Sequence, residues 1–168
     1  NLAKDEQIYS ARFFGDAGYF VTFRQTDPLF SVDLSNPRKP KILGELKISG
    51  FSEYLHFYGE NLLLGIGMEA DEKTGVTDGL KLSMFDISNP SDVKEQSKLG
   101  LPDYDYSEAL YNYKAVLVDT DKNLFGFHAE GYHEEDYKYN YLLFTFTDGA
   151  FKEVLNIDCS ENDIYSGR

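Results

Sequence analysis

The stretch LFSVDLSNPRKPKILGELK, residues 29–47, recurs later in the chain as LSMFDISNPSDVKEQSKLG, residues 82–100. Asp33 and Asp86 are 53 positions apart, and the Asn-Pro pair that follows each of them keeps the same spacing. A repeat of this length is typical of one propeller blade, for which periods run roughly 40 to 50 residues with four strands in each. The recurrence therefore predicts a fold that is built from copies of one four-stranded unit.

A second recurring feature gives a similar period. Ser52-Glu53 returns as Ser107-Glu108, 55 positions further on, and Ser160-Glu161 follows after another 53. Between these anchors the apolar runs are short and rich in aromatic and β-branched residues, and Gly, Asn-Pro or Asp-Gly separates them. This is the pattern of β-strands joined by tight turns.

We therefore predict an all-β chain that forms three consecutive four-stranded antiparallel blades of an incomplete β-propeller. The whole chain, residues 1–168, is expected to be one domain, with units at about 8–51, 52–106 and 107–158. The third unit is expected to open with a strand across SEALYNYKAVLV, residues 107–118.

The repeated Asp-x-Ser-Asn-Pro segment has a structural explanation. Proline fixes its own φ and lacks an N–H, and the residue before it favours extended geometry, so the pair ends a strand ladder and begins a turn. Asp and Ser side chains can accept hydrogen bonds from the freed backbone N–H groups. We interpret the segment as the corner of a blade, with a ligand contact as the alternative. In the third unit Asp148-Gly149 takes its place as a hairpin turn.

The composition limits the partners. With 29 acidic and 16 basic residues the formal net charge is -13, a field that repels phosphate backbones, so nucleic acid is not an expected partner. We also expect no membrane span in this segment, because it contains no run of about 18 apolar residues. Cys159 is the only cysteine, which excludes a disulfide within the chain.

The chain resembles a known family. The segment IYSARFFGDAGYFVTFRQTDPLFSVDLSNPRKPKILGELKISGFSEYLH, followed by GENLLLGIG and GLKLSMFDISNP, resembles secreted bacterial and archaeal proteins with a C-terminal β-propeller domain distantly related to WD40 repeats. The resemblance covers residues 8 to about 127, and the Asp-Ile-Ser-Asn-Pro strand ending is also similar to the LVIVD repeats of cell-surface propellers. This resemblance implies four-stranded blades and an extracellular or cell-surface location, and it assigns no catalytic residues.

The number of units has consequences for assembly. A closed propeller needs about four to eight blades, and this chain has room for three. The chain is then a piece of a longer protein, one half of a ring that two copies complete, or an open arc. Open strand edges and an uncovered sheet face favour self-association, so a homodimer is among the expected arrangements.

The segment MEADEKTGVTDG, residues 68–79, lies between the second and third predicted strands of the second unit. Its carboxylates are Glu69, Asp71, Glu72 and Asp78. Carboxylates on a loop that a rigid scaffold positions can gather a hard cation or contact a partner. Glu69, Asp71 and Asp78 are therefore candidate ligand-binding residues, with a solvated charged hairpin as the commoner alternative.

A second acidic segment, DTDKNLFGFHAE, covers residues 119–130. Asp119, Asp121 and Asn123 stand at positions 1, 3 and 5 of a calcium loop, and Glu130 stands at position 12. Leu124, however, occupies the place where such a loop needs glycine, and the flanks alternate as strands do. We predict a hairpin turn and no cofactor, with calcium as the alternative.

The segment HAEGYHEED, residues 128–136, places His128, Glu130, His133 and Glu134 close together. The spacing differs from the His-Glu-x-x-His arrangement that brings two imidazoles to one helix face. We therefore expect ordinary strand residues here rather than metal ligands.

Tyrosines are concentrated in and just before the third unit. Those that flank its start are Tyr104, Tyr106, Tyr111 and Tyr113. Tyr137, Tyr139 and Tyr141 alternate at period two and so share one face of a strand. Burial between neighbouring blades is the first expectation. A binding surface for protein or sugar that includes Tyr104, Tyr106, Tyr137 and Tyr139 is the alternative.

The sequence contains no motif of nucleophilic catalysis or phosphate binding, such as Gly-x-Ser-x-Gly or a P-loop. The leading hypothesis is a non-catalytic, extracellular propeller segment that acts as a scaffold or protein-interaction module. The alternative is a carbohydrate-active enzyme of the glycosidase or lyase class, or a module that binds cell-surface polysaccharide. Carboxylates are abundant, although a glycosidase needs a pair held about 5 to 10 Å apart.

Overall fold

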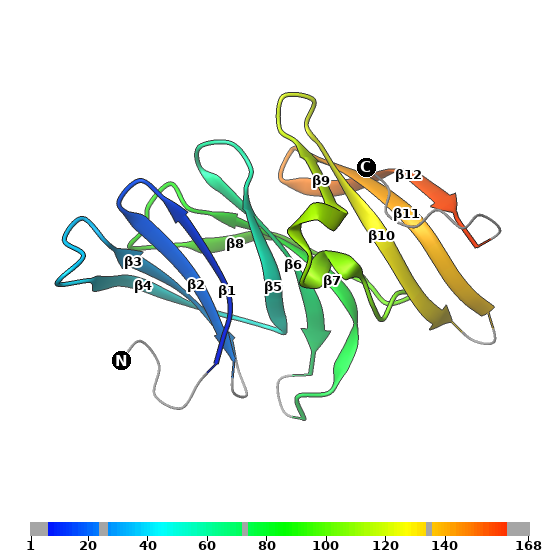
Figure 1. Ribbon diagram of the computed structural model, residues 1–168, viewed down its shortest axis with the longest axis horizontal. Helices are drawn as coiled ribbons and strands as arrows, with labels where there is room; N and C mark the ends of the chain where they lie inside the picture. The colour runs from blue at the N-terminus through cyan, green and yellow to red at the C-terminus, as the bar shows by residue number, and fades with distance from the viewer. Residues whose placement is uncertain (1–6, 24–26, 72–73, 134–135, 161–168) are drawn as a thin grey trace.

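The computed structural model describes residues 7–23, 27–71, 74–133 and 136–160, and these form three sheets arranged side by side in a fan (Figure 1). The strands are β1 (Gln7–Phe14), β2 (Ala17–Phe23), β3 (Asp27–Asp33), β4 (Lys41–Ile48), β5 (Phe51–Phe57), β6 (Leu62–Ala70), β7 (Thr77–Asp86), β8 (Lys94–Leu101), β9 (Val116–Asp119), β10 (Leu124–His133), β11 (Asp136–Thr147) and β12 (Ala150–Asp158). Each sheet is an antiparallel meander of four consecutive strands, β1–β4, β5–β8 and β9–β12. The predicted all-β architecture of three four-stranded blades is thus confirmed.

The repeated corner has the same geometry in the first two sheets. Asp33 Oδ1 accepts a hydrogen bond from Ser35 N at 2.9 Å, and Asp86 Oδ1 accepts one from Ser88 N at 2.9 Å. The Asn of each corner accepts from the backbone N–H two residues further on, at 3.1 Å in both cases. The acceptors are therefore Asp and Asn, whereas the sequence had suggested Asp and Ser. The segment acts as the corner of a blade.

The start of the third unit differs from the prediction. Residues 107–115 form two short 3-10 turns, η1 (Glu108–Leu110) and η2 (Tyr113–Ala115), and the strand begins only at Val116. Ser107 and Asn112 accept hydrogen bonds from backbone N–H groups two residues ahead of them, at 3.1 Å each. Such local bonds compete with a strand ladder, so the predicted strand over 107–118 is wrong for most of its length.

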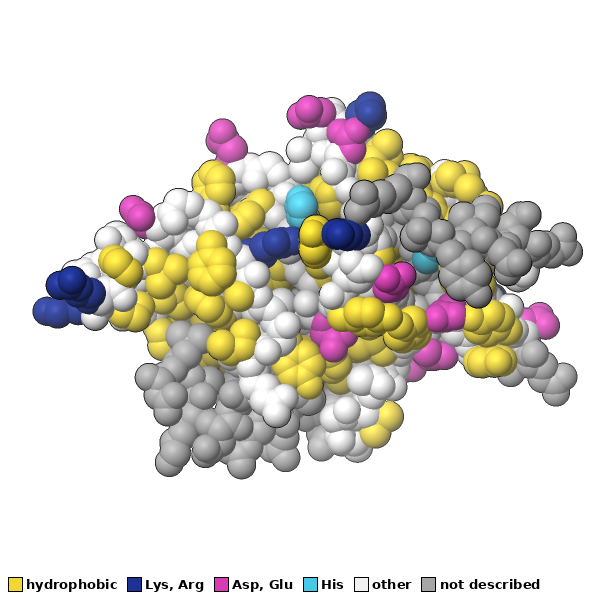
Figure 2. All heavy atoms as spheres, viewed as in Figure 1, with side chains coloured by type: hydrophobic (Ala, Val, Ile, Leu, Met, Phe, Trp, Pro, Cys, Tyr) yellow, Lys and Arg dark blue, Asp and Glu magenta, His cyan; other side chains and the backbone are white. Residues whose placement is uncertain are grey.

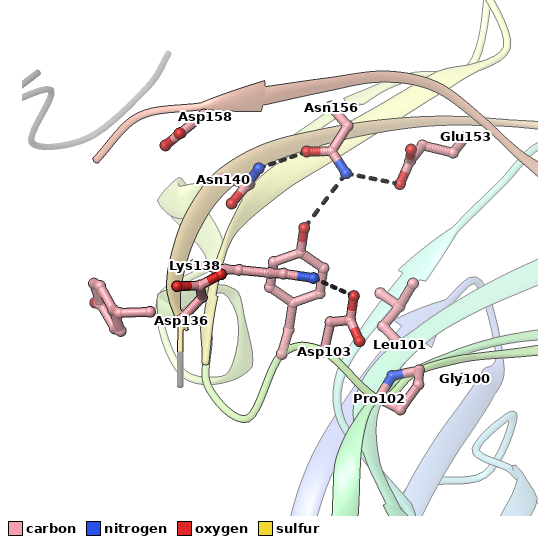
Figure 3. A pocket seen from close by; sticks show the side chains of 12 residues that line it. Gly100, Leu101, Pro102, Asp103, Asp136, Lys138, Asn140, Glu153, Asn156 and Asp158 are labelled. Carbon is pink, nitrogen blue, oxygen red and sulfur yellow. Dashed lines mark hydrogen bonds and ion pairs between the residues drawn. The ribbon is translucent and has the colours of Figure 1, made fainter. Parts of the chain in front are cut away.

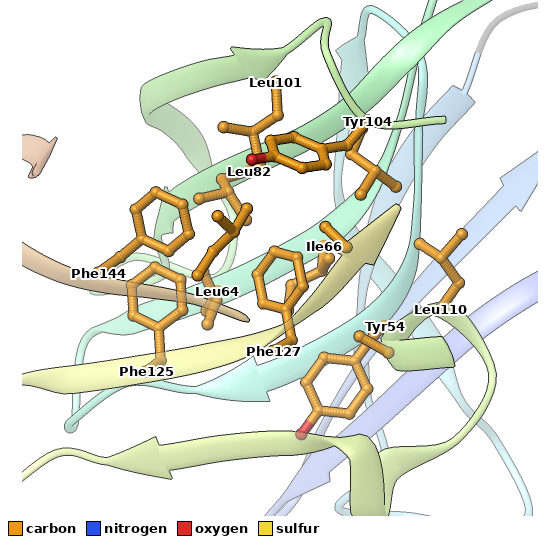
Figure 4. Packing of buried hydrophobic residues seen from close by; sticks show 14 of the residues in the cluster. Tyr54, Leu64, Ile66, Leu82, Leu101, Tyr104, Leu110, Phe125, Phe127 and Phe144 are labelled. Atoms are coloured by element: carbon orange, nitrogen blue, oxygen red, sulfur yellow. The ribbon is translucent and has the colours of Figure 1, made fainter. Parts of the chain in front are cut away.

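The main core lies between the second and third sheets (Figure 4). At its centre, aliphatic side chains of the second sheet meet aromatic rings of the third, and these central members are Leu64, Ile66, Leu82, Phe125, Phe127 and Phe144. Phe125 and Phe144 stack with ring centroids 5.5 Å apart, and all six side chains are fully buried. Full burial of such a side chain contributes about 1.5–3 kcal/mol, so this interface fixes the third sheet on the second.

A second core lies between the first and second sheets. Val21 and Leu29 of the first sheet pack in the same cluster as Leu63 and Phe85 of the second. Because successive side chains of a strand point to opposite faces, Leu63 faces the first sheet while Leu64 faces the third. The second sheet is consequently buried on both faces.

The first strands of the first two sheets, β1 and β5, lie side by side (Figure 1). Ser10 Oγ donates to the Ser52 carbonyl at 2.6 Å, and Arg12 Nε donates to the Leu55 carbonyl. In the described part of the chain no helix is long and apolar enough to cross a membrane.

Candidate functional site

The segment predicted as a carboxylate loop is mainly a continuation of the β6–β7 hairpin, so Glu69 and Asp78 lie in strands. Glu69 forms an ion pair with Lys98, with 2.9 Å between Oε2 and Nζ. Asp71 Oδ1 accepts hydrogen bonds from the backbone N and hydroxyl of Thr74 at 2.8 and 2.9 Å. Asp78 is exposed. Two of the three candidate carboxylates therefore have separate local roles, Glu69 in an ion pair with β8 and Asp71 in closing a turn.

The second acidic segment forms the turn between β9 and β10. Asp119 accepts from Lys122 N at 3.1 Å and pairs with the Lys122 ammonium at 2.8 Å. Asn123 has a left-handed φ of 54°, and Asp121 is exposed. Glu130 lies further along β10, where it accepts a hydrogen bond from a tyrosine of β11. The ladder thus separates Glu130 from the turn, and the segment has the geometry of a hairpin.

His128 is packed between aromatic rings. Its ring stacks on Tyr139 with centroids 5.3 Å apart and an interplanar angle of 9°, and it meets Tyr141 edge-on at 4.9 Å. Burial lowers the pKa of His128, which keeps the imidazole neutral at pH 7. Over the residues that the structure describes, no group of three or more His, Cys, Asp or Glu could hold a metal ion. Glu72, Glu134 and the side chain of His133 lie outside the described residues.

The β11 tyrosines do share one face. Leu142 and Phe144 alternate with them and are buried against the second sheet, so Tyr139 and Tyr141 lie on the opposite face of the third sheet. The expectation that these tyrosines are buried between neighbouring sheets is therefore wrong. They are half-buried, and Tyr137 at the strand end is 46% exposed.

The other two candidate tyrosines differ from each other in exposure. Tyr104 is buried in the main core, whereas Tyr106 is exposed and its hydroxyl hydrogen-bonds that of Tyr111. This hydrogen bond raises the pKa of Tyr106 to about 12. The hydrogen bond that Tyr137 donates to Glu130 raises the pKa of Tyr137 to about 12 as well. Both phenols are protonated at neutral pH, and Tyr137 donates to Glu130.

A polar cleft of about 660 Å³ opens between the second and third sheets, where residues 100–104 face β11 and β12 (Figure 3). Asn156 joins its walls: it accepts from Asn140 at 2.7 Å and donates to the Tyr104 hydroxyl at 3.4 Å. Lys138 pairs with Asp103 across the cleft. Tyr104 and Tyr137 both line the cleft, which brings together two of the four predicted tyrosines.

The cleft is acidic. Its lining includes four carboxylates, which belong to Asp103, Asp136, Glu153 and Asp158. Hydrogen bonds from Ser160 lower the pKa of Asp158, so this carboxylate remains ionised at neutral pH. With its amides, hydroxyls and carboxylates the cleft offers hydrogen-bonding groups to a polar ligand.

A second concavity, which we call the inner-strand groove, has a volume of about 390 Å³. It is formed by β1, β5 and the segment of η1 and η2. Its lining residues are Tyr9, Ser10, Ala11, Arg12, Glu53, Tyr54, Leu55, Leu110, Tyr111 and Tyr113. Tyr111 and Tyr113 are each about two-thirds exposed, at 68% and 67%, and Tyr9 is 37% exposed. The groove therefore presents aromatic rings to solvent.

Two of the groove's side chains lie at points where the register between paired strands shifts. The β1–β2 register shifts between Ile8 and Ser10, and the β5–β6 register shifts between Ser52 and Tyr54. The extra residues at these shifts are Tyr9 and Glu53. A β-bulge typically redirects a side chain away from the regular alternation. Tyr9 and Glu53 are thus displayed at equivalent points of adjacent strands.

The two charged side chains of β1 and β5 in the groove, Arg12 and Glu53, have different environments. Burial alone raises the pKa of Glu53. The Arg12 guanidinium lies 5.3 Å from the Tyr54 ring centroid and donates to the Leu55 carbonyl. Burial, and secondarily the charge of Arg12, lower the pKa of His56. Arg12 is therefore directed toward Tyr54 and His56, and no hydrogen bond or ion pair of the described residues engages the Glu53 carboxylate.

The sequence pattern singled out only Tyr111 and Tyr113 of the inner-strand groove, and the expectation that these two rings are buried between blades is wrong because both are about two-thirds exposed. Glu53 appeared only as part of the recurring Ser-Glu anchor, and Tyr9 and Arg12 were not candidates. The recurrence of Ser52-Glu53 as Ser107-Glu108 marks the beginning of the second and third units, and that position was the available signal. The register shifts that display Tyr9 and Glu53 have no sequence signature, because a bulge depends on pairing with the neighbouring strand.

Three antiparallel four-stranded meanders that pack face to face are the arrangement of propeller blades. A family profile described as "Beta propeller domain" matches residues 1–166. The chain belongs to the β-propeller domain family.

Two archaeal relatives are similar to this β-propeller domain. An uncharacterized protein of Archaeoglobus fulgidus is 51% identical over 121 residues, which cover 72% of this chain and 18% of the relative. An uncharacterized protein of Methanocaldococcus jannaschii is 47% identical over 124 residues, which cover 74% of this chain and 19% of the relative. The chain thus spans about a fifth of the length of the curated relatives it matches.

Among solved structures, a chain in an S. cerevisiae complex of Dbp5 with Nup159 and Gle1 is similar over 88% of this chain and 47% of that chain. The identity is 16% and the TM-score is 0.28, which is too low to carry an argument about fold or function.

Proposed function

We propose that this chain is a non-catalytic interaction module of a longer, extracellular β-propeller protein distantly related to WD40 repeats. The observation that carries the proposal is the inner-strand groove, in which exposed tyrosine rings lie beside a half-buried carboxylate. Tyrosine is enriched at recognition surfaces because one ring offers apolar area and a hydroxyl at a low cost in conformational entropy. The extracellular location rests on the resemblance of residues 8–127 to exported proteins.

The outer sheet faces support a scaffold role. The first sheet exposes apolar side chains such as Phe13 and Ile42, and the third exposes Leu155 and Ile157, at fractions from 44% to 59%. These faces suit a neighbouring sheet, which further chain or a second copy would supply. Light scattering of the purified chain would detect a second copy. A dimer mass is expected if the chain self-associates, and a monomer mass is expected if sheets from further chain cover these faces.

Selection of peptides from a displayed random library against the folded domain tests the interaction function. We expect enriched sequences whose binding is lost in the Tyr111→Ser/Tyr113→Ser double variant, because it removes two rings of the groove. Tyr132→Ser is the matched control, since Tyr132 is 72% exposed but does not line the groove. Binding that survives the double variant, or a library that yields no enrichment, would contradict the proposal.

The polar cleft of Figure 3 supports a second candidate function, recognition of a cell-surface polysaccharide. Its Asn140–Asn156 pair, the Lys138–Asp103 pair and the rim ring of Tyr137 are groups that bind sugar hydroxyls and stack on sugar rings. Retarded migration in gels that contain polysaccharide would support this function, and Asn156→Leu should abolish it. Release of new reducing ends would instead indicate the carbohydrate-active enzyme.

A further inference from the structure

We infer that the inner-strand groove binds a cationic side chain of a protein partner, with Glu53 as its charge partner and exposed tyrosine rings around it. This inference rests on the interaction function proposed above and names the chemistry of the group that the groove receives. It begins from the carboxylate of Glu53, whose burial destabilises the folded chain.

Glu53 has few compensating contacts. It is half-buried on β5, and burial raises its pKa without an opposing hydrogen bond or positive charge. In the described part of the chain no ion pair or hydrogen bond engages its carboxylate. Carboxylates are usually partnered when they leave water, so an unpartnered one at the wall of a groove indicates that the partner comes from outside.

The cationic side chain among the groove's lining residues, Arg12, is committed elsewhere. Arg12 lines the same groove, but its Nε donates to the Leu55 carbonyl and its guanidinium lies over the Tyr54 ring. The charge of Arg12 acts to lower the pKa values of Tyr54 and His56. Burial is the sole cause of the shift in the pKa of Glu53. The groove therefore retains a negative carboxylate that an incoming cation can pair with.

The aromatic walls favour the same class of ligand. The exposed rings of the groove belong to Tyr9, Tyr111 and Tyr113. An ammonium or guanidinium group is attracted to the face of such a ring by about 0.5–1 kcal/mol at exposed sites. The chain already shows this preference, because the Lys114 ammonium lies 5.9 Å from the Tyr113 centroid.

The setting on the surface is consistent with a cationic partner. Figure 2 shows hydrophobic side chains in a discontinuous band from the first sheet toward the third, with Lys or Arg side chains near its middle and acidic side chains beside its right half. The formal charge of -13 raises the local concentration of cationic groups and speeds their encounter with the surface. A volume of about 390 Å³ accommodates one lysine or arginine side chain.

The test is a titration of the folded 168-residue chain with n-butylammonium chloride, followed by backbone amide NMR shifts. We expect saturable changes in the amide shifts of Tyr9, Glu53 and Tyr113. Neither 1-butanol nor sodium chloride at the same concentration should produce these changes. n-Propylguanidinium chloride distinguishes an arginine-like from a lysine-like preference.

Two variants make the test specific. Glu53→Gln should weaken n-butylammonium binding about tenfold, the effect of removing one charge-assisted hydrogen bond. Glu45→Gln removes the same charge from an exposed site on β4 and should leave binding unchanged. Shifts that do not saturate, or that weaken equally in both variants, would overturn the inference.

The outcomes also separate this inference from the function on which it rests. If selected peptides lack basic residues but still require Tyr111 and Tyr113, the groove is an interaction site and the cationic inference fails. If n-butylammonium binds but no peptide is selected, the cation site stands and the proposed interaction function fails.

Discussion

Tyr9 and Glu53 occupy equivalent positions in adjacent strands, each as the extra residue at a register shift, and both line the inner-strand groove. A regular β5 would alternate its side chains between the first and third sheets, as Tyr54 and Leu55 do. The register shift in each strand places the Glu53 carboxylate and the Tyr9 ring in the same groove.

Glu53→Gln should stabilise the protein at pH 7. Burial raises the folded-state pKa of Glu53 above its unfolded value, so ionised Glu53 destabilises the folded state at pH values above both. Below the unfolded pKa of about 4.3 the carboxyl is neutral in both states and the penalty disappears. Urea unfolding should therefore show a gain for the variant at pH 7 that vanishes near pH 4, and an equal gain at both values would contradict this cause.

Gly67→Ala should destabilise the fold strongly. Gly67 pairs with Ser52 beside the register shift, and a Cβ there would collide with the Phe51 carbonyl group, which belongs to the backbone and cannot move aside. Overpacking of this kind costs about 1–3 kcal/mol or more. Gly100→Ala is the control, because a Cβ at Gly100 meets nothing within 4 Å and should leave the free energy of unfolding within about 0.5 kcal/mol. Equal effects in urea titrations would count against the packing described for β5 and β6.

Phe127→Ala should cost about 3–5 kcal/mol of unfolding free energy, because Phe127 is fully buried between the second and third sheets. Val76→Ala, at a position 66% exposed, should change it by less than about 0.5 kcal/mol. Thermal unfolding followed by circular dichroism checks both, and a small effect at Phe127 would mean that the third sheet does not pack as described.

The blade corners should make the protein sensitive to acid. Hydrogen bonds from Ser35 and Ser88 lower the folded-state pKa values of Asp33 and Asp86 below their unfolded values. The stability that these bonds contribute is complete above the unfolded pKa of about 3.9 and is lost as the pH falls through the folded-state pKa values.

The Asp33→Asn/Asp86→Asn variant keeps an acceptor oxygen at each corner but does not titrate. Its stability should therefore fall less steeply than that of the wild type between about pH 5 and pH 2. Asp121→Asn, in the exposed β9–β10 turn, provides a control for the loss of a carboxylate. Parallel stability curves for the wild type and the double variant would refute the role assigned to the corners.

The regular part of the fold could be predicted from the sequence because its signals are local. The spacing of Asp33 and Asp86 gave the period, and the left-handed φ values of Asp148 and Gly149, 55° and 75°, confirm the hairpin turn that was predicted there. The two 3-10 turns were missed because the caps at Ser107 and Asn112 compete with a strand that the apolar pattern favours equally well.

The candidate site was harder to predict because it depends on pairing across strands. The period-two spacing of Tyr139 and Tyr141 gives a shared face, but only the packing of Phe144 on the second sheet decides which face that is. Likewise, Glu53 looks like any strand carboxylate in the sequence, and the register shift beside it is what makes it line the groove.

Displacement of a selected peptide by n-butylammonium chloride tests most directly whether the inner-strand groove binds a cationic side chain. Fluorescence polarisation would follow a labelled peptide that binds the wild type through Tyr111 and Tyr113. We expect displacement by n-butylammonium but not by 1-butanol, and weaker peptide binding to Glu53→Gln than to Glu45→Gln. A peptide that stays bound in the presence of n-butylammonium, and that binds both variants equally, would contradict this expectation.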